Sequence, residues 1–388
     1  MSTRYFETVT SKSVYEIKLE SEFPSSNDAA LSIDDLQPSG SNWGRRQLFA
    51  CQVIISPTAA QVLPAYKQYT RIERPQETQE IQDFLDGPDT DLMHHSTHFL
   101  MGEYGETLGE LWGALASVKH YPRPIPRNDG TPEAKRARRG VVHTGYVHSA
   151  GIQVSSSNPE DRNHSSPGGS EGSTGYTETK PTQELPAEDN ALHLINRVLR
   201  HLLYYTQPLN ASPVLDLRQK CRMVSQISEL KKQFVAVDDG GLILRVEGGV
   251  STGPHIAIAL LEAKRRLVVD DNKPRISDEC LAQMTCEAIL ARAIPAEEQL
   301  GNERTIVLNA TSHYVCFLEF NVTKAYMRRL MAGQLPSESL KVTATHWFDL
   351  SAVEGRRGVL NNIRGLLGMA MDRQPQQDVI SDSEGVED

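Results

Sequence analysis

The sequence predicts an α/β fold in which helices flank a mixed central sheet, and two observations support this class. In the C-terminal half, some segments repeat apolar residues at helical spacing, whereas others are short and almost continuously apolar. The short runs are separated by glycine-rich turns, as strands commonly are. Their order along the chain (helix, three strands, helix, two strands) is typical of helices packed against a sheet.

The helices are predicted from apolar stripes and from one capping residue. The first carries Leu192, Ile195 and Leu199 on one face. Ser277 can cap another through its hydroxyl oxygen, and the two acidic residues that follow it favour a helix N-terminus. The expected ranges are 188–205, 216–230, 277–293 and 351–371.

The strands are predicted from the short apolar runs. The run over 256–263 is nearly continuous, as expected of a strand that is buried on both faces. A tight turn at Thr311 and Ser312 joins two further runs into a strand pair. The expected strands are 234–237, 242–246, 256–263, 305–310, 314–322 and 340–348.

Residues 1–154 are expected to form a partly ordered N-terminal region whose fold the sequence does not specify. A strand is predicted over 48–55, and a helix over 106–118, whose leucines and tryptophan share one face. Three closely spaced prolines after this helix end regular structure.

A polar segment separates this region from the C-terminal domain, which is expected over 188–371. Residues 155–187 are mostly Ser, Gly, Pro, Asn, Glu and Thr, and cannot bury enough apolar surface to offset the entropy lost on ordering. We therefore expect a disordered linker there, and a disordered acidic tail over 372–388. The N-terminal region and the tail are the expected contact points for any protein partner.

Charge balance and cysteine content narrow the class of protein. The 388 residues include 40 basic and 50 acidic ones, and the net charge of −10 argues against an overall basic surface for nucleic acid. A local basic groove remains compatible with that total. Five scattered cysteines without a CxxC motif disfavour a disulfide framework or a structural zinc site.

The sequence also bears on location. It has no apolar signal-peptide core and no apolar run of about 18 residues, so we expect a soluble intracellular protein that does not enter a membrane. A basic cluster runs from Lys135 to Arg139 and favours a nuclear location, either as a localisation signal or as a phosphate-contacting patch. A solvated surface segment is the alternative.

Candidate chemistry lies at the end of the strand predicted over 256–263, where Glu262 and Lys264 follow the apolar run. Because side chains alternate along a strand, both point to the same face. Two charges at the end of a buried strand are costly unless they pair or hold a metal. A carboxylate suits Mg²⁺, and a lysine can activate water or stabilise charge on a phosphate. The alternative is a solvated strand end.

A second carboxylate is expected to converge on Glu262. Asp239 precedes a Gly-Gly turn, and the strand that leaves this turn is expected to pair with the strand that ends in Glu262. Asp238 competes for the same role, and the sequence does not separate the two.

These segments resemble the PD-(D/E)XK nuclease-like superfamily, in particular the nuclease-like domains of uncharacterised filamentous-fungal proteins. Asp239 with its Gly-Gly turn resembles the aspartate motif, and Glu262-Ala263-Lys264 resembles the (D/E)xK motif. Gln283 is similar to the glutamine on the next helix of many members. The resemblance covers residues 188–371, and the chain departs from the pattern in having no proline before the aspartate.

The resemblance implies a core of helix, three strands, helix and strand, with Mg²⁺ or Mn²⁺ bound by Asp239 and Glu262. Lys264 and Gln283 would assist catalysis, and an acid on the first helix, best represented by Glu188, would be a further metal ligand. The implied activity is hydrolysis of phosphodiester bonds in DNA or RNA. The alternative is an inactive nuclease fold that binds nucleic acid or protein. Taken alone, Gln283 reads as an exposed helix residue and Glu188 as an acid that complements the helix dipole.

Other motifs are weaker. His94, His95 and His98 form an HHxxH pattern, which suits metal ligands on a helix, but no acid or cysteine cluster lies nearby. A polar surface segment is the favoured interpretation. The sequence contains no GxxxxGK[ST] pattern, which defines P-loop NTPases, and this class is therefore not supported.

Overall fold

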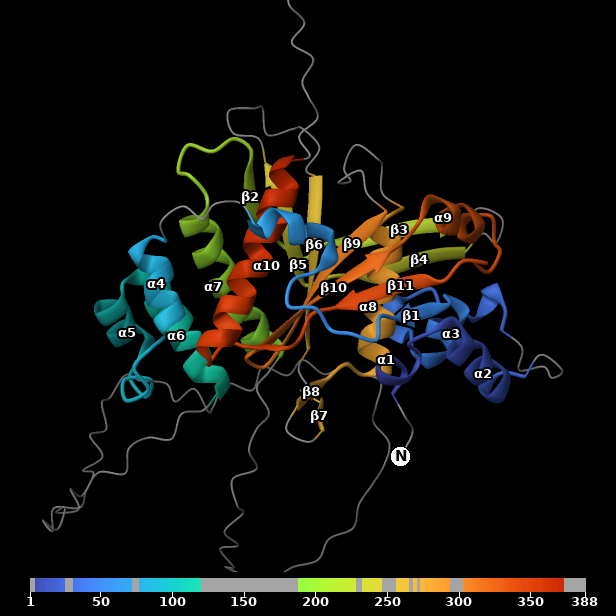
Figure 1. Cartoon of the computed structure of the whole chain (residues 1–388), viewed down its shortest axis with the longest axis horizontal. Helices are drawn as coiled ribbons and strands as arrows, with labels where there is room; N and C mark the ends of the chain where they lie inside the picture. The colour runs from blue at the N-terminus through green and yellow to red at the C-terminus, as the bar shows by residue number, and fades with distance from the viewer. Residues whose placement is uncertain are drawn as a thin grey trace, which may run out of the picture. The chain divides into compact units, whose positions relative to one another are not determined.

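Figure 1 shows the computed structural model, which describes residues 4–24, 31–71, 77–119, 188–227, 232–245, 256–264, 268–270, 273–293 and 303–372. All of these residues belong to one compact unit, formed by residues 1–123 and 185–388. The predicted linker over 155–187, the basic cluster and all but the first residue of the predicted tail lie outside the described residues.

Helices make up much of the described chain. The α-helices are α1 (Tyr5–Thr8), α2 (Lys12–Glu22), α3 (Arg45–Ala50), α4 (Gln79–Asp86), α5 (Thr97–Tyr104), α6 (Glu106–Lys119), α7 (Glu188–Thr206), α8 (Asp278–Ala291), α9 (Lys324–Met331) and α10 (Val353–Asp372). Short 3₁₀ helices are η1 (Ile33–Asp35), η2 (Gly40–Asn42) and η3 (Pro64–Arg71). None of these described helices combines the length and the apolarity needed to cross a bilayer.

The strands are mostly short. They are β1 (Val53–Ile55), β2 (Val214–Arg218), β3 (Arg222–Ile227), β4 (Lys232–Val237), β5 (Gly240–Arg245), β6 (Ile256–Lys264), β7 (Val268–Asp270), β8 (Lys273–Arg275), β9 (Arg304–Thr311), β10 (Tyr314–Asn321), β11 (Leu340–Ala344) and β12 (Phe348–Asp349).

Eight of the described strands form one mixed sheet in the order β1-β11-β10-β9-β6-β5-β2, with β12 paired to β10. The pairs β1–β11 and β6–β9 are parallel, and the other neighbours are antiparallel. The hairpins β3–β4 and β7–β8 form separate two-stranded sheets. The predicted α/β class, with helices flanking a mixed sheet, is confirmed.

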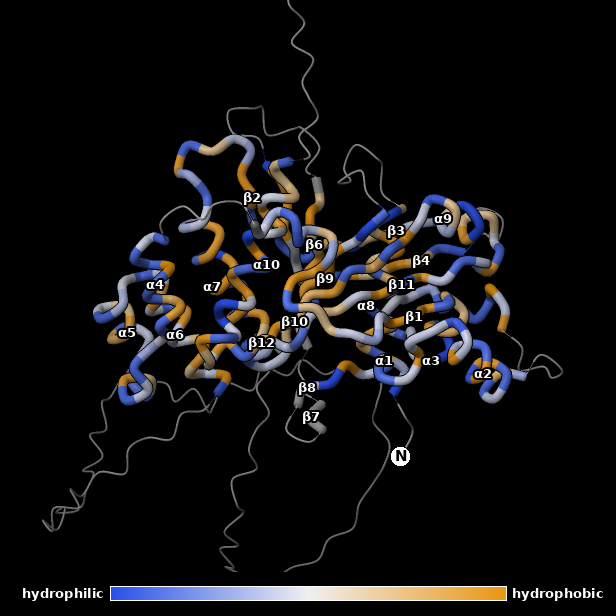
Figure 2. The backbone as a smooth tube through the Cα atoms, viewed as in Figure 1, coloured by the Kyte–Doolittle hydropathy of each residue, from blue (hydrophilic) through white to orange (hydrophobic). Residues whose placement is uncertain are grey.

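Each face of the sheet carries its own hydrophobic core. Along β9, Ile306 and Leu308 pack into one core and Val307 packs into the other, because successive strand side chains point to opposite faces. Buried residues of α4, α5, α6, α7 and α10 join the first core, and those of α1, α2, α3, α8 and α9 join the second. Figure 2 shows hydrophobic residues concentrated along the central strands.

The N-terminal elements share this sheet and both cores. β1 pairs with β11 at the edge of the sheet, α1 and α3 contact α8, and α6 packs on α7 (Figure 1). Described elements on the two sides of residues 120–187 therefore build one structure together. The expected domain boundaries within that interval stay a prediction.

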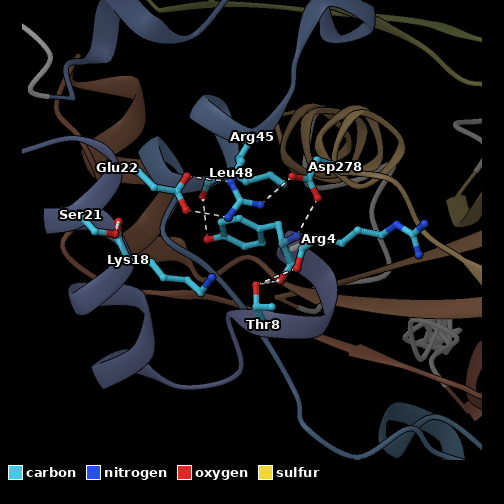
Figure 3. A network of polar contacts seen from close by, with 9 residues as sticks. Arg4, Thr8, Lys18, Ser21, Glu22, Arg45, Leu48 and Asp278 are labelled. Atoms are coloured by element: carbon cyan, nitrogen blue, oxygen red, sulfur yellow. Dashed lines mark hydrogen bonds and ion pairs between the residues drawn. The ribbon is translucent and has the colours of Figure 1, made fainter. Parts of the chain in front are cut away.

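A polar network ties α1 and α2 to the N-terminus of α8 (Figure 3). The Arg45 guanidinium donates two hydrogen bonds of 2.7 Å to Glu22 and one of 2.8 Å to Asp278 Oδ2. Asp278 Oδ1 accepts a 2.7 Å bond from the backbone N–H of Tyr5. Because these bonds are charge-assisted and partly buried, the network fixes α1 against α8.

Most of the predicted elements are confirmed with small shifts at their ends. The helices expected over 106–118, 188–205, 277–293 and 351–371 correspond to α6, α7, α8 and α10. The strands expected over 256–263, 305–310 and 314–322 correspond to β6, β9 and β10. Ser277 caps α8 as predicted, because its hydroxyl accepts a 3.1 Å hydrogen bond from Cys280 N–H.

The helix predicted over 216–230 is wrong. This segment contributes to β2 and β3, which pair with β5 and β4 respectively. Met223 is buried whereas its neighbours Arg222 and Val224 are exposed, which is the two-residue period of a strand. Pairing with distant strands therefore outweighs the local helical pattern.

Two strand predictions need correction. The run over 48–55 divides into the helix α3 and the short strand β1, because Gln52 adopts a positive φ of 51° and breaks the chain direction between them. The run over 340–348 divides into β11 and β12, which pair with different parts of β10.

Candidate functional site

The candidate site lies on the face of the sheet that packs against α8. Glu262 lies near the C-terminal end of the strand β6, and its side chain is only 1% exposed. Gln283 of α8 donates hydrogen bonds from Nε2 to Glu262 Oε1 at 2.7 Å and to Glu287 Oε1 at 3.0 Å. One amide thus holds two carboxyl groups from two different elements.

Glu287 is a buried carboxyl that the sequence analysis missed. Burial, followed by the nearby charge of Glu262, raises the pKa of Glu287 well above its usual range. The protonated form of Glu287 is therefore favoured, and Gln283 donates a hydrogen bond to each carboxyl group. The sequence feature that could have identified Glu287 is its position four residues after Gln283. This spacing places both side chains on one face of a helix.

Asp239 lies directly beside the segment that follows Glu262. Its backbone N–H donates to Leu261 O at 2.9 Å, and its Oδ2 accepts a 2.9 Å hydrogen bond from Ala263 N–H. Oδ1 lies 3.8 Å from Lys220 Nζ, and the side chain is 14% exposed. Asp239 is thus the solvent-facing carboxylate of this site, and Glu262 is the buried one.

Two glycines allow β5 to leave the Asp239 turn so close to β6. Gly240 has a φ of +145°, which disfavours residues with a Cβ. A Cβ at Gly241 would lie 2.3 Å from Ala259 O, so a side chain there would push the two strands apart.

Asp238 has a different environment from Asp239. It is fully buried, and the Arg218 guanidinium binds both of its carboxylate oxygens. Asp238 Oδ1 also accepts hydrogen bonds from the N–H groups of Cys221 at 3.0 Å and Gly240 at 3.1 Å. Both carboxylate oxygens of Asp238 therefore hold the turn. Of the two aspartates between which the sequence did not decide, the geometry favours Asp239 as the candidate metal ligand.

Lys264 and Glu188 are placed only through their backbones. Lys264 ends β6 in register with Thr311 of β9, and Glu188 begins α7. The side chains of both residues lie outside the described part of the structure, so the roles predicted for them stay predictions.

Asn309 is a second buried polar residue that the sequence analysis missed. It is the register partner of Glu262 across the parallel β6–β9 pair and is 2% exposed. Its Nδ2 lies 3.8 Å from Cys280 Sγ, and its Oδ1 has no hydrogen-bond partner among the described residues. Register partners on adjacent strands share a face, so Asn309 lies on the same side as Glu262.

The donor chemistry can be compared with the implied metal. Asp239 and Glu262 offer only oxygen atoms, which suits a hard cation such as Mg²⁺ or Mn²⁺. Among the described residues, however, no group of three or more His, Cys, Asp and Glu side chains is arranged to hold a metal ion. A metal at these two carboxylates would take its remaining ligands from water and substrate oxygens, as Mg²⁺ commonly does.

The HHxxH motif belongs to the surface. His94, His95 and His98 are exposed, and α5 begins only at Thr97, so the three do not share a helix face. The ring of His95 stacks on Phe99 with centroids 4.1 Å apart, and the ring of His94 lies 4.1 Å from that of His95. The favoured interpretation as a polar surface segment is therefore confirmed.

No protein-family model, curated protein or solved structure matches this chain. The three motif segments are joined by the contact of Asp239 with Ala263 and by that of Gln283 with Glu262.

Proposed function

We propose that this protein is a metal-dependent nuclease of the PD-(D/E)XK type, which hydrolyses phosphodiester bonds of DNA or RNA. The observation that carries the proposal is the convergence of three distant segments at one end of β6. Asp239 contacts Ala263, and Gln283 contacts Glu262, so the aspartate turn, the ExK segment and the following helix meet. The resemblance to the nuclease superfamily implies that these three segments lie together. Their local sequences alone do not require it.

The order and pairing of the core elements support the same proposal. The chain runs through α7, β2, β5, β6, α8 and β9, which is the implied order with the hairpins β3–β4 and β7–β8 inserted. β6 is antiparallel to β5 and parallel to β9, with α7 in one core and α8 in the other. The carboxylates therefore lie near the C-terminal ends of two parallel strands, where α/β proteins commonly bind ligands.

In the proposed site, Asp239 and Glu262 hold Mg²⁺ or Mn²⁺, and Glu188 stays a candidate for a further ligand. The metal, when bound, polarises the phosphate and lowers the pKa of bound water. Gln283 keeps Glu262 oriented, and the raised pKa of Glu287 favours its neutral form, which limits the negative charge beside Glu262. Lys264 would stabilise charge that develops on the phosphate or orient the attacking water.

The test is a cleavage assay with single- and double-stranded DNA and RNA in the presence of Mg²⁺. We expect Glu262→Gln and Asp239→Asn to abolish cleavage, Lys264→Met to reduce it strongly, and Gln283→Leu to reduce it about 10–100-fold, as loss of a ligand-orienting group does. Arg328→Gln, an exposed change on α9, is the matched control. Cleavage that persists in EDTA, or in both carboxylate variants, would show that these residues do not carry the activity.

A second candidate function is a nuclease fold that binds nucleic acid or protein without cleaving. Its support is that Asp239 already engages Ala263 and Lys220, that Glu262 is almost completely buried, and that the chain is acidic overall. Calorimetric titration with Mg²⁺ separates the two. Tight binding that Asp239→Ala removes supports the enzyme, and absence of binding supports the scaffold.

We further propose an intracellular, nuclear location, which rests on the basic cluster from Lys135 to Arg139. Any protein partner is proposed to bind the N-terminal region or the acidic tail. Replacing the cluster's arginines with glutamine and imaging a fluorescent fusion tests the location.

A further inference from the structure

A cleft of about 570 Å³ opens between the N-terminal elements and the end of the sheet. Its size falls within the range of roughly 300–1,000 Å³ found for ligand pockets. The residues that give it chemical character come from α1, β8, β10 and the segment after β11. They are Phe6, Arg275, Tyr314, Cys316, His346 and Trp347.

The cleft lies on the same face of the sheet as Glu262. Glu262 is in register with Asn309, and Asn309 is in register with Cys316, so these residues form one row across β6, β9 and β10. Because neighbouring strands are about 4.8 Å apart, Cys316 in the cleft lies roughly 10 Å from Glu262 along this row. The next row joins Lys264, Thr311 and Tyr314, so a second cleft residue continues the row that Lys264 begins.

The walls combine aromatic rings with one guanidinium. Phe6, Tyr314 and Trp347 are half-buried, so each leaves part of its ring accessible. Within the described part of the chain, the ionic partner of Arg275 is Glu7 at 3.1 Å, and Arg275 Nε makes no hydrogen bond. Rings that stack on bases and a guanidinium that contacts phosphate are the two features by which proteins hold single-stranded nucleic acid.

Charge at this wall is compatible with an anion. Glu7 Oε1 lies 3.7 Å from Arg4 and 3.1 Å from Arg275, so two guanidinium groups surround one carboxylate. His346 and the hydroxyl groups of Thr10 and Ser56 supply further polar atoms on the lining.

The wall formed by α1 is held in place. Tyr5 N–H donates to Asp278, and Asp278 pairs with Arg45 at 2.8 Å (Figure 3). Phe6 and Glu7 follow Tyr5 directly, so this network fixes the side of the cleft that they line. A preformed wall lowers the entropy cost of binding.

We infer that this cleft binds one nucleotide, with the base against Trp347, Tyr314 or Phe6 and the phosphate at Arg275. The ligand is a nucleotide of a single strand, and a free nucleotide carries the same chemistry. The inference rests on the proposed nuclease function for the identity of the strand as substrate, but binding itself is measurable without cleavage.

Trp347 supplies the signal for the test. Of the chain's three tryptophans, Trp43 and Trp112 are 3% and 0% exposed, so Trp347 is the one that a ligand can reach. The full chain in EDTA is titrated with a short single-stranded DNA, with AMP and with a blunt duplex. We expect the single strand to quench tryptophan fluorescence, and AMP to do so more weakly because it lacks the contacts of a strand.

Variants assign the contacts. Trp347→Leu should weaken single-strand binding about tenfold, the size of one base–aromatic stack, and Trp347→Phe should retain most of it. Arg275→Gln should weaken binding and lower the slope of log affinity against log salt by about 0.7, the value for one phosphate contact on a single strand. Arg328→Gln is the control of equal charge change, and thermal melting verifies that every variant is folded.

The outcomes separate this inference from the proposed function. Single-strand binding that depends on Trp347 and Arg275 and persists in Glu262→Gln supports the cleft, even if no cleavage is ever detected. AMP binding equal to strand binding supports the cleft as a site for the free nucleotide. Absence of quenching by both ligands, or binding that Trp347→Leu and Arg275→Gln leave unchanged, overturns the inference whether or not the protein cleaves DNA.

Discussion

At the scale of single residues, the candidate site is organised around one amide. Gln283 donates to Glu262 and to Glu287, which brings two carboxyl groups together inside the core. Two buried carboxyl groups in contact cannot both ionise at low cost, so one of them keeps a proton. Burial and the nearby charge of Glu262 raise the pKa of Glu287, so the protonated form is favoured at Glu287.

The pH dependence of stability follows from this protonation. In the unfolded chain Glu287 has its usual pKa near 4.5, whereas in the folded chain its pKa is raised. Between these two values the folded state holds a proton that the unfolded state has lost, so stability falls as pH rises. The stabilising effect of the neutral group is complete below the unfolded pKa and is lost as pH rises through the folded pKa.

We therefore predict that Glu287→Gln becomes more stable than wild type as pH rises above about 4.5, by at most about 1.4 kcal/mol for each pH unit. The amide of the variant can still accept the hydrogen bond from Gln283. Urea unfolding of both proteins from pH 4 to pH 8 measures the difference. If the difference in the free energy of unfolding between the two proteins stays constant over this range, the pKa of Glu287 is the same in the folded and the unfolded chain.

The site could be predicted from the sequence only in part. Asp239, Glu262 and Gln283 were found because each belongs to a short motif with a recognisable neighbourhood. Arg218 was missed as the partner of Asp238 because its segment was expected to be helical, and a helix would not have brought it to the turn. Asn309 lies in an apolar strand, and only the parallel register shows that it faces the Glu262 side.

At the scale of elements, α8 connects the candidate site with the N-terminal helices. Gln283 and Glu287 point from α8 toward the Glu262 carboxylate, while Asp278 at its N-terminus holds Arg45 and Tyr5. The Arg45 guanidinium also lies 5.6 Å from the Tyr5 ring and 5.7 Å from the Phe49 ring. Arg45, the first residue of α3, therefore contacts α1, α2 and α8 through one side chain.

We predict that Arg45→Ala destabilises the protein by roughly 1–2 kcal/mol, since charge-assisted hydrogen bonds are lost but the site is partly solvated. Hydrogen exchange should speed up in α1 and α2 and stay unchanged in β9 and β10. Lys12→Ala is the control, because Lys12 and Glu16 are 4.0 Å apart and both are largely exposed. Uniformly faster exchange throughout the sheet would contradict a local role for Arg45.

Elements were predicted well where one strong pattern governed them. Continuous apolar sequence identified β6, and a capping serine followed by two acidic residues identified α8. Where an element depends on a distant partner, the local pattern misled, as in β2 and β3. The short strand β1 was recognised only as part of a longer run, because its place at the edge of the sheet comes from β11.

At the scale of the whole molecule, the sheet is assembled from both halves of the chain. β1 comes from the N-terminal part and the other seven strands from residues after 187, while α6 packs on α7 across the same interval. Each half buries its apolar faces against the other, so neither has a complete core alone.

We predict that cutting the chain between residues 124 and 184, at an inserted protease site, leaves two fragments that co-elute in size-exclusion chromatography. They should separate only in denaturant, because the contacts across the cut include strand pairing and two hydrophobic cores. The uncut protein serves as the reference for elution. Fragments that separate in native buffer and keep cooperative unfolding would indicate two independent domains.

The pairing of β1 with β11 also has a consequence for the order of folding. Val53 pairs with Leu340, and 340 − 53 gives a separation of 287 residues. Contacts between residues so far apart in sequence form slowly, and chains are synthesised from the N-terminus. The strand β1 must therefore wait on the ribosome for its partner strand until nearly the whole chain has emerged. Chaperones that shield nascent chains would act on this early segment first.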